Sequence, residues 1–282
     1  MKVGKWLFEK ISQFYAKETK DIKRSYLCDF GRICHEVIPG DVLLVEGTNR
    51  ISRHIKWITQ SPWTHAALYI GRIHSIEDEN TRALVEKYYQ GKASDQLLID
   101  TIVGQGTFIR PLTEYQRHHL RICRPTGISQ QDAQKVINFA ASHLGRAYNT
   151  RQFIDLARFV LANRWFIPKR WRSSLFKHKP PTDTAKDICS SLIADAFNAI
   201  KFPILPYVRS TDNKNGIEYI RRNTKLYTPA DFDYSPYFSI IKYPFYRYTD
   251  QDSPYQYLPW REDLVSHDEG VISETEDNSS KE

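Results

Sequence analysis

The chain has 282 residues, of which 41% are hydrophobic and 13% aromatic. That content is ample for a buried core, and the length is long for one domain and short for two. The net charge of +7 leaves nucleic acid, an anionic membrane surface and an anionic substrate open as partners. No stretch approaches the ~20 apolar residues of a membrane-spanning helix, and Lys5, Glu9 and Lys10 interrupt any secretory apolar run. We therefore expect a cytoplasmic protein.

The four cysteines argue for free thiols, not for a disulfide framework. Cys28, Cys34, Cys123 and Cys189 form no Cys-x-x-Cys pair, and no histidine spacing beside them is typical of zinc. Thiols stay reduced in the cytosol. Free thiols are the prediction, with no metal and no cofactor, although Cys28 and Cys34 as metal ligands are a disfavoured alternative.

The N-terminal segment, residues 1–30, carries an amphipathic helix. Its apolar residues recur at helical spacing among lysines: Val3, Trp6, Leu7, Ile11, Phe14 and Tyr15. We expect this helix to pack on the body of the protein; the alternative is that it lies on a membrane surface.

Strands dominate the next part of the chain. The turn at Pro39–Asp41 introduces them, and Gly104–Gly106 turns the last two into a hairpin. Residues 74–96 are polar and predict an inserted excursion, helical around 83–89. The predicted strands are residues 42–45, 65–71, 97–102 and 107–110.

Two helices follow. Ser129 and Asp132 form a capping box for the first, which we expect to run to Gly145. The second begins at or near Asp187–Cys189 and ends before Pro203.

The segments between and after these helices differ in charge. Arg158–Lys179 has seven Lys or Arg and no acid, and it contains Trp165, Phe166, Trp171 and Phe176. It lies within an insertion of about 158–186. Residues 227–260, rich in aromatics and prolines, predict short strands and turns that wrap the core. We divide the chain into the N-terminal segment, a domain over 31–260, and an acidic disordered tail over 261–282.

Cys189 and His65 are the candidate catalytic pair. Cys189 stands where an amphipathic helix begins, so free backbone N–H groups lie beside its thiol. A thiol is a nucleophile only as the thiolate, which a helix N-terminus or an imidazolium favours. His65 opens an apolar strand. Each residue alone is weak evidence, because buried cysteines are usually inert.

The order of several motifs carries more information. The motifs run Gly40-Asp41-Val42-Leu43-Leu44, then residues 58–68 with His65, then Leu98-Ile99-Asp100, then Gly145-Arg146-Ala147-Tyr148-Asn149, then Ile188-Cys189-Ser190-Ser191-Leu192. In this order the sequence resembles the YaeF/YiiX-type permuted papain-like amidases of the NlpC superfamily over residues 38–245. In that family the His-bearing strands precede the Cys-bearing helix.

The resemblance implies a fold and residue roles. The fold is α+β and circularly permuted papain-like, with an antiparallel barrel-like sheet packed on the Cys-bearing helix. Cys189 would attack an acyl carbon, His65 would act as base, and Asp100 would orient His65; Glu86 and Glu46 are the fallback acids. Tyr148 and Ser190 are the candidate substrate-binding residues.

Three functions remain in view. The first is a cysteine amidase acting on a cell-wall-type peptide or a lipid amide. The second is a lipid-directed thioesterase, phospholipase or acyltransferase, favoured by the basic N-terminal helix and Arg158–Lys179, which suit an anionic headgroup surface. The third, a non-catalytic lipid-binding protein, is disfavoured by the presence of Cys189 and His65. No nucleic-acid motif is recognisable, and the oligomeric state is left open.

Overall fold

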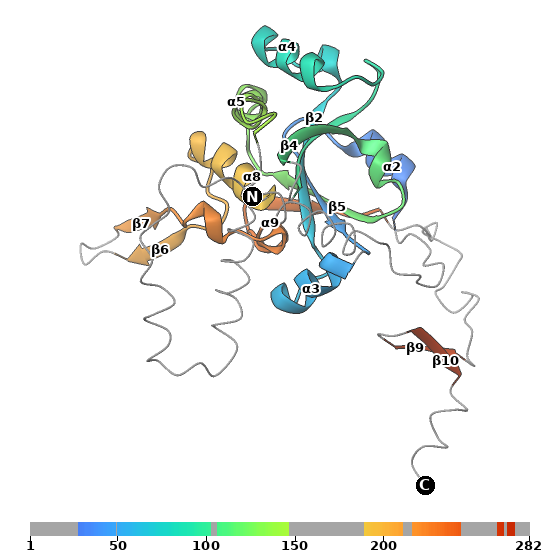
Figure 1. Ribbon diagram of the computed structural model, residues 1–282. Helices are drawn as coiled ribbons and strands as arrows, with labels where there is room; N and C mark the ends of the chain where they lie inside the picture. The colour runs from blue at the N-terminus through green and yellow to red at the C-terminus, as the bar shows by residue number, and fades with distance from the viewer. Residues whose placement is uncertain are drawn as a thin grey trace, which may run out of the picture.

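A computed structural model (Figure 1) describes most of the residues between 28 and 243. The predicted N-terminal helix and the basic segment 158–179 lie outside the described residues. The described ranges are 28–48, 50–102, 106–146, 189–210, 216–243, 264–267 and 270–273.

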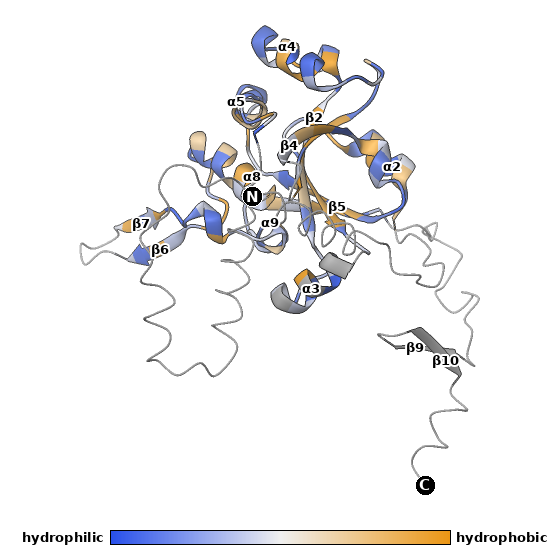
Figure 2. Cartoon of the chain, viewed as in Figure 1, coloured by the Kyte–Doolittle hydropathy of each residue, from blue (hydrophilic) through white to orange (hydrophobic). Residues whose placement is uncertain are grey.

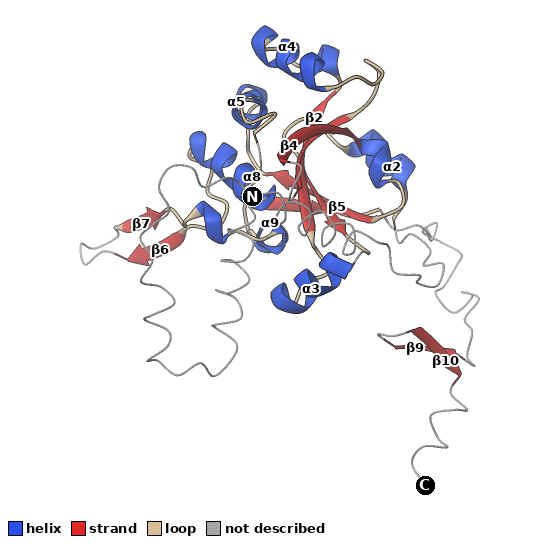
Figure 3. Ribbon diagram, viewed as in Figure 1, coloured by secondary structure: helices blue, strands red, loops and turns tan. Residues whose placement is uncertain are grey.

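A six-stranded sheet forms the centre of the molecule. Its strand order is β4-β3-β2-β1-β5-β8, every neighbouring pair is antiparallel, and the sheet curls strongly (Figure 3). The prediction of a mixed α and β protein with a large antiparallel sheet is confirmed. The strands are β1 Val42–Glu46, β2 His65–Gly71, β3 Leu97–Ile102, β4 Gly106–Pro111, β5 His119–Pro125 and β8 Phe238–Ile241.

Strand β5 is the sheet member that the sequence analysis missed. Leu120, Ile122 and Cys123 are buried in it, but Arg121 stands between the first two, and His119 and Arg124 flank the three. These cations pair with acids from other elements, such as Arg121 with Asp233. The pattern of alternating apolar residues is therefore broken by ion pairs that form only in the folded protein.

Two apolar clusters lie on opposite faces of the sheet, because successive strand residues point to opposite sides. In β1, Val42 and Leu44 belong to one cluster, and Leu43 and Val45 to the other. Figure 2 shows the apolar colouring of these strands against more mixed helices.

Helices cover the two faces. Residues of α4 (Glu79–Tyr88), α5 (Gln130–Ala141) and α8 (Cys189–Ala199) enter the first cluster, and α2 (Phe30–Glu36) and the 3-10 helix η2 (Leu112–Tyr115) enter the second. Helix α8 also contacts β2 and β3. The remaining helices are α3 Arg50–Thr59, α9 Pro229–Tyr234 and the 3-10 helices η1 Ile73–Ser75 and η3 Thr224–Leu226.

Helix α5 begins as its sequence predicts and ends earlier. The Ser129 side chain accepts a hydrogen bond from the backbone N–H of Asp132. The helix stops at Ala141 and a turn carries the chain to Gly145, whose φ of 76° is left-handed. Gly145 therefore ends the turn after the helix, not the helix itself.

Two hairpins lie outside the main sheet. Strands β6 (Tyr207–Ser210) and β7 (Ile217–Ile220) form one, and β9 (Leu264–His267) and β10 (Gly270–Ser273) form the other. The second hairpin falls within residues 261–282, for which the sequence predicts a disordered tail. Within the described ranges, no helix has the length and apolar character needed to cross a membrane.

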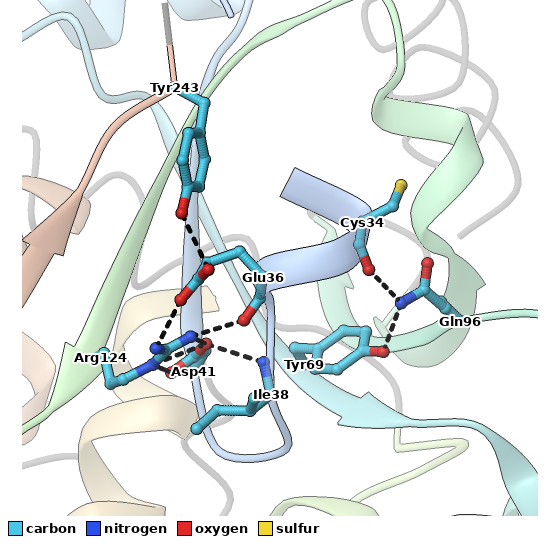
Figure 4. A network of polar contacts seen from close by, with 8 residues as sticks. All are labelled: Cys34, Glu36, Ile38, Asp41, Tyr69, Gln96, Arg124 and Tyr243. Carbon is cyan, nitrogen blue, oxygen red and sulfur yellow. Dashed lines mark hydrogen bonds and ion pairs between the residues drawn. The ribbon is translucent and has the colours of Figure 1, made fainter. Parts of the chain in front are cut away.

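The Gly40-Asp41 motif builds a closed polar network beside β1 (Figure 4). Asp41 is 1% exposed and accepts hydrogen bonds from the Arg124 guanidinium and from the backbone N–H of Ile38 at 2.9 Å. Arg124 also reaches Glu36 at 2.9 Å, and Glu36 accepts a 2.8 Å bond from the Tyr243 hydroxyl. This motif therefore joins α2, β1 and β5, and its role is structural.

Candidate active site

His65 and Asp100 meet on neighbouring strands. His65 is the first residue of β2 and Asp100 is the fourth of β3. The imidazole Nε2 lies 2.6 Å from Asp100 Oδ1, with the His65 side chain 18% exposed and that of Asp100 fully buried. An ionised carboxylate can only accept, so the proton lies on Nε2 and leaves Nδ1 for another partner.

Two further residues hold the Asp100 carboxylate. The Tyr115 hydroxyl donates to Oδ2 at 2.5 Å, and Arg110 Nε lies 3.3 Å from the same oxygen. Arg110 also pairs with Glu114 at 3.2 Å, and its guanidinium lies over the Tyr115 ring. Asp100 is therefore buried but has a donor or cation at each oxygen, which offsets the cost of its desolvation.

Cys189 lies close enough to His65 to raise the pKa of the imidazole. It is the first residue of α8 and is 8% exposed. Leu192 and Ile193 anchor the helix in the same cluster as Ala66 and Leu68 of β2 and its neighbours. Burial of this apolar face sets the start of α8, and thus the thiol, against the strand that carries His65.

The pKa directions follow from these contacts. Burial lowers the pKa of His65, but the neighbouring Asp100 and Cys189 raise it well above its ordinary value. Burial raises the pKa of Asp100, yet His65, Tyr115 and Arg110 together bring it below its ordinary value. Both shifts favour an imidazolium beside a carboxylate.

The other residues named from the sequence have different surroundings. Tyr148 lies outside the described residues. Ser190 is fully buried and donates a 2.6 Å hydrogen bond to the Tyr227 carbonyl, which fixes the start of α8. Its role in substrate binding stays a prediction. Glu46 contacts Lys56 and His119, so it is not the acid that contacts His65.

Tyr115 and Arg110 were not identified from the sequence. Arg110 faces the same side of the hairpin as Asp100 only through the register that pairs Asp100 with Phe108. Tyr115 lies in η2, after β4. A sequence signal for Arg110 does exist. Arg110 is two residues after Phe108, the residue opposite Asp100, and side chains two residues apart in a strand lie on the same face of the sheet.

The comparison with protein families agrees with this arrangement. Residues 36–156 match the model described as permuted papain-like amidase enzyme, YaeF/YiiX, C92 family. The resemblance to the YaeF/YiiX permuted papain-like amidases is confirmed. The matched residues include His65 and Asp100 and end before Cys189, and the match supports a hydrolase of the amidase kind.

Other comparisons add a structural neighbour. The crystal structure of metalloprotein yiiX from Escherichia coli O157:H7 aligns with 13% identity, over 73% of this chain and 96% of that chain, at a TM-score of 0.43. The search of curated proteins gave no match. Among the described residues of this chain, no group of three or more His, Cys, Asp or Glu side chains is arranged to hold a metal ion.

Proposed function

We propose that the protein is a cysteine amidase that works through an acyl-enzyme on Cys189. The observation that carries the proposal is the 2.6 Å contact between His65 and the buried carboxylate of Asp100, at the end of the strand against which the Cys189 helix packs. This arrangement supports Cys189 as nucleophile, His65 as base and Asp100 as the acid that orients the base.

The proposed reaction has two halves. Transfer of the Cys189 thiol proton to neutral His65 gives the imidazolium, which the raised pKa of His65 favours, and the sulfur bonds to the amide carbon. The C–N bond then breaks, and His65 returns the proton to the leaving amine. In the second half His65 takes a proton from water, the hydroxyl bonds to the thioester carbon, and the carboxylic acid leaves as the thiol re-forms.

The start of α8 supports the tetrahedral intermediates. The first N–H groups of a helix have no partner within it, and they carry the positive end of the helix dipole. Cys189 begins this 11-residue helix, so its own backbone N–H is the candidate donor to the developing oxyanion. Asp100 keeps the imidazole in one tautomer and takes no proton.

The fold proposed for this chemistry is circularly permuted papain-like. Its support is the chain order, in which β2 with His65 and β3 with Asp100 precede α8 with Cys189. The substrate class proposed is an amide of a cell-wall-type peptide or of a lipid, in the cytoplasm. An acyltransferase would share the first half-reaction and differ only in the acceptor that receives the acyl group.

Intact-mass measurement of the acyl-enzyme tests the proposal. The protein is mixed with a panel of peptide and lipid amides and esters and quenched in acid. We expect a mass increase equal to the acyl group, mapped to Cys189, and its absence in Cys189→Ala. Cys34→Ala is the matched control, because Cys34 is partly exposed and outside the site. An adduct that persists in Cys189→Ala would contradict the proposal.

A further inference from the structure

Helix α3 lies in an acid-free part of the chain. Residues 47–76 contain no Asp or Glu, and they include Arg50, Arg53 and Lys56 of α3. Such a charge excess attracts anionic surfaces over a Debye length of about 8 Å at physiological salt.

The outward side of α3 exposes an aromatic residue beside a cation. Trp57 is 61% exposed and Arg53 is exposed as well. They stand four residues apart, so they share one helix face. Ser52, in contrast, is 6% exposed, and Lys56 pairs with Glu46 at 2.6 Å. A large exposed Trp with a flanking cation is unusual on a face that only covers a core.

This helix is tied to the end of the sheet that carries His65. Thr64, the residue before His65, accepts a 2.9 Å hydrogen bond from the Gly47 N–H and lies 3.4 Å from the Ser52 hydroxyl. A Cβ on Gly47 would come within 2.1 Å of that hydroxyl, so only glycine lets the helix approach this closely. The Lys56–Glu46 pair adds a second link, because Glu46 follows Val45, the strand partner of His65.

We propose that the Arg53–Trp57 face of α3 docks on the headgroups of an anionic phospholipid membrane. Trp is favoured at the boundary between headgroups and acyl chains, and each Arg or Lys near an anionic surface adds attraction. The four Lys and Arg of the acid-free residues 47–76, of which Lys56 is paired with Glu46, complement that surface. Docking there brings the His65 end of the sheet to the membrane, which is where a lipid-linked amide would be presented. This inference goes beyond the proposed function and does not require turnover.

Vesicle flotation with the full chain tests the docking. The vesicles are phosphatidylcholine alone or with phosphatidylglycerol. We expect binding only with phosphatidylglycerol, and release by salt. The double variant Arg53→Gln, Trp57→Ser should bind at least tenfold more weakly, since removal of one cation alone costs about fivefold.

The matched control is Arg209→Gln with Tyr234→Ser. It removes the same charge and one aromatic from β6 and α9, where Tyr234 is 82% exposed and Arg209 is 60% exposed. We expect less than a twofold change, with both variants melting close to the parent. Three results would each overturn the docking proposal. They are no vesicle binding by the parent, equal binding of the α3 variant and the parent, and equal losses of binding in the two variants. If the chain binds a soluble acidic protein through this face and does not bind the vesicles, the face belongs to a protein partner. That result would also overturn the docking proposal. None of these outcomes affects the acyl-enzyme measurement.

Discussion

Two aspartates of the sheet region are almost completely buried, and their surroundings give them opposite behaviour. Asp41 is 1% exposed and Asp100 is 0% exposed. Burial raises the pKa of Asp41 despite the Arg124 guanidinium. For Asp100, burial acts the same way, but His65, Tyr115 and Arg110 bring the pKa below its ordinary value.

The two carboxylates differ in whether a hydrogen-bond partner can change its protonation state. Within the described ranges, the Asp41 carboxylate accepts hydrogen bonds from fixed donors, an arginine and a backbone N–H (Figure 4). Asp100 instead contacts an imidazole that can gain and lose a proton. A buried carboxylate with a closed set of donors stabilises the fold, whereas one that ends on a titratable group is available for catalysis.

The largest expected effect separates the two aspartates by reactivity. Asp100→Asn should slow acylation of Cys189 by roughly 10³–10⁴-fold, because the amide favours the wrong imidazole tautomer. Asp41→Asn should change the rate of the folded protein by less than about twofold. The measurement is the rate of adduct formation by intact mass, normalised to the folded fraction. Similar losses in both variants would remove the distinction.

The Asp41 network should contribute strongly to the stability of the fold, in contrast to its small effect on the acylation rate. Arg124→Leu leaves Asp41 buried without its cation, and we expect about 3–5 kcal/mol less free energy of unfolding in urea. Arg209→Leu breaks an exposed pair with Glu218 at 2.7 Å and should cost about 0–1 kcal/mol. A small cost for Arg124→Leu would mean that the Asp41 network is not a structural centre.

The two tyrosines that donate to carboxylates sharpen the comparison. Tyr115→Phe removes a donor from buried Asp100 and should cost about 1.5–3 kcal/mol of unfolding free energy, together with a slower Cys189 acylation. Tyr243→Phe removes the donor to Glu36, which is 35% exposed, and should cost about 0.5–1 kcal/mol with no change in that rate. Urea unfolding and adduct kinetics on both variants check this, and a rate effect from Tyr243→Phe would contradict it.

The smallest effect is in the pH dependence of stability. The raised pKa of His65 gives a contribution that is fully present below its ordinary value of 6.5 and is lost as pH rises through the folded value. The lowered pKa of Asp100 gives one that is present above 3.8 and is lost as pH falls. For Asp41, with a raised pKa, stability is instead lost as pH rises. In thermal unfolding at acid pH, the melting temperature of Asp100→Asn should therefore fall less steeply with decreasing pH than that of the parent. The melting temperature of Asp41→Asn should not show this smaller slope.

Much of the sheet could be predicted from the sequence, because strands with uninterrupted apolar residues can be recognised from the sequence pattern. Strands β2 and β3 have the bounds that the pattern predicts. Helices α2 and α3 were missed. Helix α3 mixes its apolar residues with three cations, and its position depends on Ser52, Thr64 and Lys56 making tertiary contacts. Local pattern does not contain such contacts.

The candidate site shows the same division. His65, Asp100 and Cys189 could be named because motif order and a known family carry them, and the structure places His65 and Asp100 2.6 Å apart. Tyr115 and Arg110 could not, because their contact with Asp100 depends on hairpin register and on the path of η2. Residues that support a site are identified by their three-dimensional contacts, and the pattern of a single sequence does not contain those contacts.

Thiol labelling tests the central claim most directly. Burial raises the pKa values of Cys28, Cys34 and Cys123 from 9.0, so these thiols should react slowly with iodoacetamide at mildly acidic pH. Peptide mapping of the native protein across pH should find Cys189 labelled first, with that advantage lost in His65→Ala. Equal labelling of Cys189 and the other three cysteines at every pH, or an unchanged Cys189 rate in His65→Ala, would show that His65 does not activate this thiol.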